Sequence, residues 1–450
     1  MRNAVLKHLV EGAFNSSSRS RSVVAAATNS SLPFSLFSRR HAVSASLADE
    51  EGETVVFPRE GPGASYGLNW ALAGRGVIVK DKAFYNLKSS ELQQKGAASA
   101  ESLSGLPIHI RGNATGGASE ISKAQFSKLL KQVTSHLSSI SNVFVHDGAV
   151  SSSPKCDAKV RIISDSPSAV LSLSNILWRT PTRAVSHDSC PVTLYAATSI
   201  SQNTAEVIGL GSQVNTGFLA ADVEHSSLIL CSKAFSDIHG IKDALAAVAA
   251  PIISAREGIP LSARLFLSGD SVILLFTPED TVQSLSDLLV STDAGVVLSS
   301  QGVAPLFQTG ASGAPNLYKL PAAMLLVTSD SSGTLPSVCK ISSGQAAYHF
   351  LAGYQNGNFV PAYGKGPSPV DPLELAKSLL LKLKENQIPS FLVNIGEGDK
   401  RKTGKELVKL VQSILSSSIP PFEPKAGDLQ AKYNSFVSGR FQELPEEFSF

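Results

Sequence analysis

One segment constrains the fold of this chain more than any other, because three kinds of local structure follow one another within it. Residues 325–355 read LLVTSDSSGTLPSVCKISSGQAAYHFLAGYQ. The apolar run Ala323 to Val327 predicts a buried strand. The Ser, Gly and Pro residues of Ser329 to Pro336 predict a turn, and the amphipathic pattern from Ser342 or Ser343 onward predicts a helix. We therefore expect an α/β unit here.

The order of residues in this segment resembles ATP-dependent phosphoenolpyruvate carboxykinase. In that family the strand leads through an Asp, a glycine turn and a Leu-Pro-x-Val step into a helix that ends in Tyr-x-Phe-Leu-x-Gly-Tyr. The residues at those places are Asp330, Gly333, Leu335, Pro336, Val338, Tyr348, Phe350, Leu351, Gly353 and Tyr354. Two further stretches, Val143 to Ser164 and Phe391 to Ile414, resemble the same family in the same order.

This resemblance implies a two-domain α/β architecture, with an N-terminal α/β domain and a degenerate mononucleotide-binding α/β domain. The expected divisions are residues 1–48 as a presequence, 49–65 as a flexible linker, 66–240 and 241–428 as the two domains, and 429–450 as a C-terminal tail. Apolar periodicity predicts helices at Lys123 to Leu137, Ile241 to Ile253, Leu373 to Lys384 and Thr403 to Leu415, with strands at Val143, Val160 and Val192.

The family binds its nucleotide with a glycine-rich loop after a strand, where backbone N–H groups and a Lys contact the phosphates and a Thr binds Mg²⁺. The strand is present here as Val272 to Phe276, but the residues after it include neither Gly nor Lys up to Ser284. The vestigial loop positions are Thr277, Pro278, Glu279, Asp280, Thr281 and Ser284.

Two physical effects oppose phosphate binding at this loop. Pro278 lacks an N–H that could face a phosphate. Glu279 and Asp280 would each repel a phosphate charge at ~4 Å by about 4 kcal/mol at a surface-type dielectric. The alternative interpretation is an ordinary acidic helix start, in which Thr277 or Asp280 caps the next helix.

The remaining family positions are also incomplete in this sequence. The family uses a Lys, a His and an Asp for a second metal, and the nearest residues here are Lys233, Leu267 and Asp293. The family's oxaloacetate-binding Arg corresponds best to Arg111, which is offset by one position. Because hard cations need several oxygen ligands, Asp293 alone does not make a metal site. We expect no catalytic residue, no metal and no cofactor, although the family uses ATP with Mg²⁺ or Mn²⁺.

A basic group near the C-terminal region leaves two interpretations open. Lys400, Arg401, Lys402 and Lys405 could hold a phosphate or form a solvated helix start. The four cysteines, Cys156, Cys190, Cys231 and Cys339, are widely spaced and predict reduced, structural thiols. The local triplet His187-Asp188-Ser189 does not predict a hydrolase, since catalytic triads are assembled in space.

Composition excludes some classes of function. With 43% hydrophobic residues, 17% charged residues and a net charge of +2, the 450-residue chain predicts folded domains without a general nucleic-acid surface. No apolar run approaches the ~18 to 20 residues that a spanning helix needs, so we expect no membrane insertion.

The first 48 residues differ from the rest of the chain. They contain a single acid, Glu11, among many serines and alanines. Their basic residues are Arg2, Lys7, Arg19, Arg21, Arg39 and Arg40. This composition is typical of an organellar presequence, and it predicts the mitochondrial matrix, with the plastid as the alternative.

These observations favour a catalytically inactive carboxykinase-like protein that acts as a structural, assembly or regulatory subunit with a protein partner in mitochondria. Scaffold motifs persist where ligand-binding motifs do not, and fold alone does not confer function. One alternative is a divergent but active enzyme that converts oxaloacetate and ATP to phosphoenolpyruvate, CO₂ and ADP in gluconeogenesis. A second alternative is a nucleotide or anion sensor without turnover.

Overall fold

The computed structural model of the chain describes the compact unit Pro58–Phe450 over most of its length. The described residues are 63, 65–112, 118–180, 190–201, 203–210, 216–309, 315–364, 366–397, 400–401, 404–416, 419–425 and 427–450. The predicted presequence and the triplet His187-Asp188-Ser189 lie outside them.

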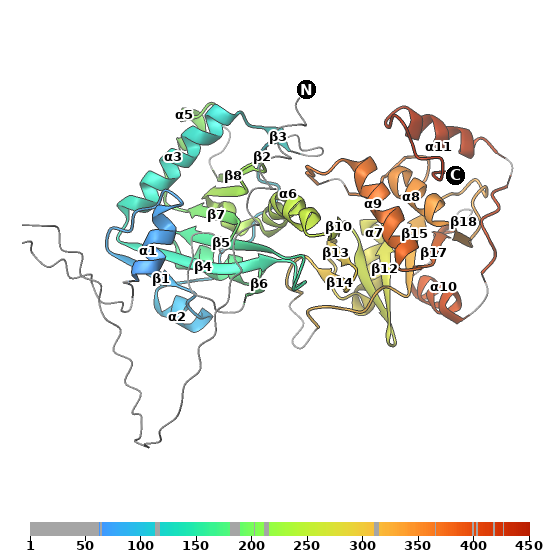
Figure 1. The fold of residues 1–450 in the computed structure, drawn as a ribbon, viewed down its shortest axis with the longest axis horizontal. Helices are drawn as coiled ribbons and strands as arrows, with labels where there is room; N and C mark the ends of the chain where they lie inside the picture. Colours follow the sequence, from blue (N-terminus) through green and yellow to red (C-terminus); the bar gives the residue numbers. More distant parts are fainter. Residues whose placement is uncertain are drawn as a thin grey trace, which may run out of the picture. The chain divides into compact units, whose positions relative to one another are not determined.

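A nine-stranded mixed sheet organises the N-terminal half of this unit (Figure 1). Its strands run in the order β1-β4-β5-β7-β9-β8-β2-β3, with β6 paired to β4. They are β1 Lys82–Tyr85, β2 Ile108–Arg111, β3 Ser119–Glu120, β4 Asn142–Val150, β5 Ala158–Ser164, β6 Trp178–Arg179, β7 Val192–Ala197, β8 Gly217–Asp222 and β9 Ser227–Ser232. The predicted strands at Val143, Val160 and Val192 are confirmed.

Helices cover both faces of this sheet, because alternate residues of each strand point to opposite sides. Ile162 of β5 belongs to the core that α2, α4 and α6 complete, whereas the next residue, Ile163, belongs to the core of α1, α3 and α5. These helices are α1 Tyr66–Ala73, α2 Ser89–Gln94, α3 Lys123–Ser139, α4 Pro167–Ser174, α5 Thr204–Val207 and α6 Ile238–Ala255. The predicted helix from Lys123 is confirmed, and Ser122 forms a capping box with Gln125 at its start.

Helix α6 is longer and more apolar than the sequence analysis expected of any segment. In the described part of the chain it is the one helix that is long and apolar enough to cross a membrane, by length and composition alone. Half of it is buried, and residues from Ile241 to Ile253 pack into the core of the nine-stranded sheet. The proposed division into domains at residue 240 stays a prediction, although this packing joins α6 to the N-terminal sheet.

A five-stranded sheet organises the C-terminal half, in the order β11-β12-β15-β17-β16. Strands β12, β15 and β17 are parallel, whereas β11 and β16 are antiparallel to their neighbours. The strands are β11 Arg264–Ser268, β12 Ser271–Phe276, β15 Ala323–Thr328, β16 Val338–Ile341 and β17 Ser390–Asn394. A three-stranded sheet consists of β10 Ile259–Leu261, β13 Val296–Ser299 and β14 Gly302–Pro305, and β18 Gly396–Glu397 pairs with β19 Lys400–Arg401.

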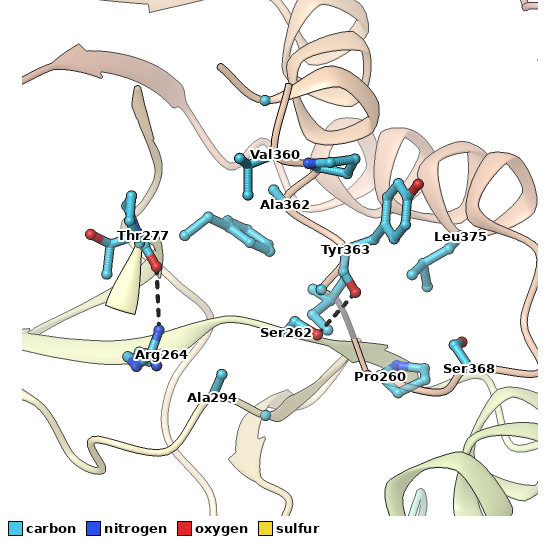
Figure 2. Close-up of a pocket in the computed structure, with 18 of the residues that line it drawn as sticks. Pro260, Ser262, Arg264, Thr277, Ala294, Val360, Ala362, Tyr363, Ser368 and Leu375 are labelled. Carbon is cyan, nitrogen blue, oxygen red and sulfur yellow. Dashed lines mark hydrogen bonds between the residues drawn. The ribbon is translucent and has the colours of Figure 1, made fainter. Parts of the chain in front are cut away.

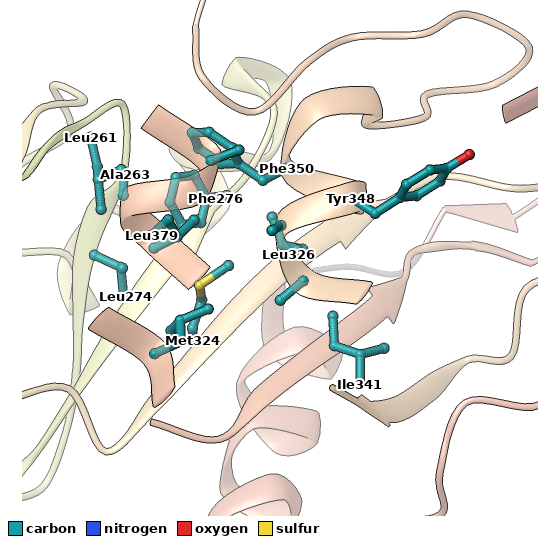
Figure 3. Close-up of a cluster of buried hydrophobic side chains, with 14 of the residues drawn as sticks. Leu261, Ala263, Leu274, Phe276, Met324, Leu326, Ile341, Tyr348, Phe350 and Leu379 are labelled. Carbon is teal, nitrogen blue, oxygen red and sulfur yellow. The ribbon is translucent and has the colours of Figure 1, made fainter. Parts of the chain in front are cut away.

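The second sheet is also buried on both faces, as central parallel strands require. Met324 and Leu326 of β15 face a core that includes α8, α9 and α11, and Figure 3 shows them beside Phe276 and Phe350. Leu325 belongs to the opposite core, which α10 completes. The helices of this half are α7 Glu279–Val282, α8 Ser343–Ala352, α9 Pro372–Glu385, α10 Gly404–Ser416 and α11 Leu429–Ser438, with the 3₁₀ helix η2 Gln283–Leu288. A second 3₁₀ helix, η1 Lys233–Ser236, follows β9 and packs in the core of the nine-stranded sheet.

The strand, turn and helix predicted around residues 323–352 are confirmed as β15, its following turn and α8. Asp330, 1% exposed, holds the turn by accepting hydrogen bonds from the N–H groups of Ser332 and Leu335 at 2.9 Å. Its own N–H donates to Asn394 Oδ1 at 2.8 Å, which ties the turn to β17. Asp330, one of the residues that carry the family resemblance, therefore stabilises this turn in the structure.

The segment Leu429–Phe450 is part of the core, which revises its description as a tail. Tyr433 of α11 is fully buried, and its ring packs against Tyr348 and His349 of α8. The last residues pack against the same core, because Phe448 is buried and the Phe450 ring contacts His349. The prediction of structural thiols is confirmed as well, since all four cysteines are buried and none of them forms a disulfide within the described residues.

Candidate functional site

A cleft of about 640 Å³ lies at the ends of β12 and β15, where the parallel strands deliver their carboxyl ends to one edge of the sheet (Figure 2). Ligands of open α/β sheets bind at such an edge. Helix α6, residues 260–264 and the loop Gly353–Val370 form the other walls. The cleft is open, so side chains have not filled it.

The loop after β12 is short and leads directly into helix α7. Thr277, Pro278 and Glu279 line the cleft. Pro278 is the N-cap residue and forms no side-chain capping hydrogen bond, and Thr277 Oγ1 has no hydrogen-bond partner in the described part of the chain, so the expectation that Thr277 caps this helix is wrong. Thr281 is buried and does not line the cleft, and the side chains of Asp280 and Ser284 are outside the described residues.

Arg264 of β11, only 3% exposed, fixes this loop in place. Its guanidinium donates to Glu279 Oε1 at 2.5 Å, to the Thr277 carbonyl at 3.4 Å and to the Thr292 carbonyl at 2.6 Å. Figure 2 shows the contact between Arg264 and Thr277. An arginine in a phosphate site would donate to the ligand, but here Glu279 and backbone carbonyls take those donors.

Lys242 of α6 is paired in the same way. Its Nζ lies 2.5 Å from Asp293 Oδ2, and it lies 5.9 Å from the centroid of the Phe307 ring. Asp293 is therefore the partner of a lysine. The sequence reasoning did not identify Lys242 or Arg264, because neither belongs to a recognisable motif.

The structure does not bring Arg111 or Lys233 to the cleft. Arg111, at the end of β2, donates to Asp222 Oδ2 at 2.6 Å and also pairs with Glu224. Asp222, Glu224 and His225 lie close enough together to hold a metal ion, but the Arg111 guanidinium contacts all three. Lys233 is exposed in η1 and does not line the cleft.

Most other polar side chains of the cleft donate hydrogen bonds to backbone carbonyls of the segments that form its walls. Ser262 Oγ donates to the Tyr363 carbonyl at 3.0 Å, as Figure 2 shows, and Thr328 Oγ1 donates to the Tyr354 carbonyl at 2.8 Å. Gln355 Nε2 donates to the Val327 carbonyl at 3.0 Å. The cleft therefore offers few ligand-binding groups. The side chains of the basic group at residues 400–405 lie outside the described residues.

The fold and the cleft define a mixed α/β protein with a ligand-sized opening at the carboxyl ends of parallel strands. Residues 300–419 match the sequence model of the phosphoenolpyruvate carboxykinase family. Over this range the chain is similar to the ATP-dependent phosphoenolpyruvate carboxykinase family, as its sequence motifs indicated. The matched range begins after every vestigial loop position and after Asp293, Lys233 and Arg111.

Curated relatives show the same restricted similarity. Phosphoenolpyruvate carboxykinase (ATP) of Leptospira biflexa is 30% identical over 139 residues, which cover 26% of each chain. The protein of the same name from Flavobacterium johnsoniae is 29% identical over 114 residues, which are 22% of this chain and 21% of that protein. That of Bacillus cereus is 28% identical over 134 residues, which are 26% of this chain and 25% of the relative. The chain therefore spans about a fifth to a quarter of the length of these relatives.

Proposed function

We propose that this protein is a catalytically inactive member of the carboxykinase family. The observation that carries the proposal is the charge balance of the cleft, where Lys242 is paired with Asp293 and Arg264 with Glu279. A nucleoside triphosphate would need cations free to neutralise it. The pairing acids would instead repel the incoming phosphates.

The geometry of the loop after β12 supports the same proposal. A phosphate-binding loop uses successive backbone N–H groups, and Pro278 interrupts them. A metal-assisted reaction needs several oxygen ligands around the cation. Beside the cleft, Asp293 is engaged by Lys242. Of the carboxylates that line the cleft among the described residues, Glu279 is engaged by Arg264, and Asp243 alone is too few ligands for Mg²⁺ or Mn²⁺.

We further propose a structural, assembly or regulatory role in the mitochondrial matrix, with a protein partner. The presequence-like composition of residues 1–48 supports the location. Two observations support the role. The cores of both sheets are well formed, so the scaffold is retained. The described cleft, in contrast, lacks the groups that phosphoryl transfer needs.

The test is a carboxykinase assay of the purified chain with oxaloacetate, ATP and Mn²⁺. The Leptospira biflexa relative serves as the positive control, since its name states the activity. We expect no phosphoenolpyruvate above the level of a heat-denatured sample. Turnover that scales with the concentration of the chain would refute the proposal.

The open cleft favours a second candidate, a ligand-binding sensor without turnover. A pseudoenzyme with a purely structural role has no need of a 640 Å³ opening. A cavity of this size accommodates a small organic molecule. The kind of molecule depends on the charges and surfaces that the cleft presents.

A further inference from the structure

The cleft leaves one acidic group without a partner. Its two cations are both paired, as described above, but Asp243 of α6 forms no hydrogen bond or ion pair within the described residues. Asp243 stands at an exposed edge of the cleft, where the loop at Gly366 passes over it. A Cβ built on Gly366 would lie 3.7 Å from Asp243 Cγ. Burial raises the pKa of the Asp243 carboxyl above its usual range, so a positively charged ligand group beside it would stabilise the ionised form.

The wall next to Asp243 is apolar. Ala246, Ala247 and Ala250 present small side chains along the same face of α6. Phe307 and Tyr363 contribute aromatic rings to the cleft. Aromatic faces attract cations as well as apolar groups, so this wall suits an organic cation better than a phosphate.

A second polar group of the cleft also lacks a partner. His349 of α8 lines the cleft, is 2% exposed, and has no hydrogen-bond partner at either ring nitrogen. Burial lowers the pKa of its imidazole to about 3, so the ring is neutral and offers one donor and one acceptor. Buried polar groups are almost always hydrogen-bonded, and an unsatisfied one indicates a missing water or ligand.

We infer that the cleft binds a small organic cation with an apolar body, such as a primary ammonium or amidinium compound, and that Asp243 pairs with the positive group. The inference goes beyond the proposed function, because it assigns a ligand class to a cleft that has lost its phosphate site. It requires no turnover, and the ligand need not displace the Lys242 and Arg264 ion pairs.

The test uses three probes of nearly equal shape and different charge: benzylammonium, benzyl alcohol and benzoate. Binding to the full-length chain is measured by saturation-transfer NMR and by thermal-shift titration at neutral pH. We expect benzylammonium to bind most tightly, benzyl alcohol less tightly and benzoate least. Equal or tighter binding of benzoate would overturn the inference, and so would the absence of binding by benzylammonium at millimolar concentration.

Variants at exposed positions identify the group that selects the cation. Asp243→Asn should weaken benzylammonium by roughly fivefold, near the upper end for a partly exposed ion pair, and leave benzyl alcohol unchanged. Asp243→Lys should reverse the order of benzylammonium and benzoate. The matched control is Asp270→Asn in the exposed turn between β11 and β12, which should change nothing.

Benzylammonium binding that survives unchanged in Asp243→Asn would also overturn the inference. This outcome is distinguishable from failure of the proposed function, which rests on carboxykinase turnover. A chain that turns over ATP could still be tested with the three probes. An inactive chain that ignores all three would retain the proposed function and lose the assigned ligand.

Discussion

At the scale of single residues, ion pairs decide what the cleft can bind. The absence of glycine and lysine from residues 277–284 was visible in the sequence, because a phosphate-binding loop has a motif of fixed spacing. The pairing of Lys242 with Asp293 was not, because the two residues lie 51 positions apart and meet only through the packing of α6. The partner of Arg264 was equally hidden, since an arginine on an apolar strand gives no indication of which acid it meets.

A buried pair in the N-terminal sheet provides a test at this scale. Arg161 is fully buried and donates to both carboxylate oxygens of Asp147 at 2.7 and 2.8 Å. Arg161→Leu leaves that carboxylate buried without its countercharge, which should cost about 3 to 5 kcal/mol. The measurement is the free energy of unfolding in urea.

The control for Arg161→Leu is Lys377→Leu, which breaks an exposed ion pair with Glu374 one helical turn away. Such surface pairs contribute about 0.3 to 0.5 kcal/mol. Equal effects of the two substitutions would contradict the account of Arg161 as a buried, obligatory partner.

His349 predicts a pH dependence of stability. Burial lowers its pKa from 6.5 to about 3, so the folded chain disfavours the charged ring. Stability from the neutral ring is complete above the unfolded pKa of 6.5 and is lost as the pH falls below it, at up to about 1.4 kcal/mol per pH unit. His349→Phe removes this loss.

Urea unfolding of wild type and His349→Phe at pH 7 and pH 5 measures the effect. The difference between the two free energies should shift by up to about 2 kcal/mol in favour of the variant at pH 5. Other titrating groups contribute equally to both proteins and cancel. Parallel free energies at the two pH values would show that the ring is not buried in its neutral form.

At the scale of elements, local signals predicted most helices and strands. Helix α8 was recognisable because Ser342 and Gln345 form a capping box before an apolar stripe. Helix α11 was not recognised, since its few apolar residues, Leu429, Tyr433 and Val437, acquire meaning only when they meet the aromatic rings around α8. Tertiary packing rather than local propensity determines this element.

Truncation of one α11 side chain tests that packing. Tyr433 is fully buried among the rings of Tyr348, His349, Tyr354 and Phe450. Tyr433→Ala should lower the free energy of unfolding by about 3 to 5 kcal/mol, as for other large aromatic side chains in cores. Leu381→Ala on α9, where Leu381 is 57% exposed, should change it by less than about 0.5 kcal/mol.

The same truncation separates two descriptions of the C-terminal segment. If residues 429–450 were a peripheral tail, Tyr433→Ala would behave like Leu381→Ala. A large and cooperative loss of stability, followed by circular dichroism, would establish the segment as part of the core that includes α8 and α9.

At the scale of the whole molecule, the α/β architecture resembles that of the carboxykinase family, whereas the paired charges of the cleft do not favour phosphate binding. The two sheets with helices on both faces follow the α/β architecture that the sequence motifs indicated. The match at residues 300–419 covers strands and helices of the core, but it excludes the loop after β12. The sequence motifs therefore indicated the similarity to the family that this match shows. They could not establish that the cleft stays open, because its volume depends on the packing of segments far apart in the chain.

The most direct test of the central claim is a thermal-shift titration of the full-length chain with Mg-ATP, beside the Leptospira biflexa relative as a positive control. A nucleotide that binds the folded state raises the melting temperature through a stabilisation of RT ln(1 + [L]/Kd). The account predicts a flat titration for this chain and a rising one for the control. A saturable rise for this chain, abolished by substitutions in the loop at Thr277 to Thr281, would contradict it.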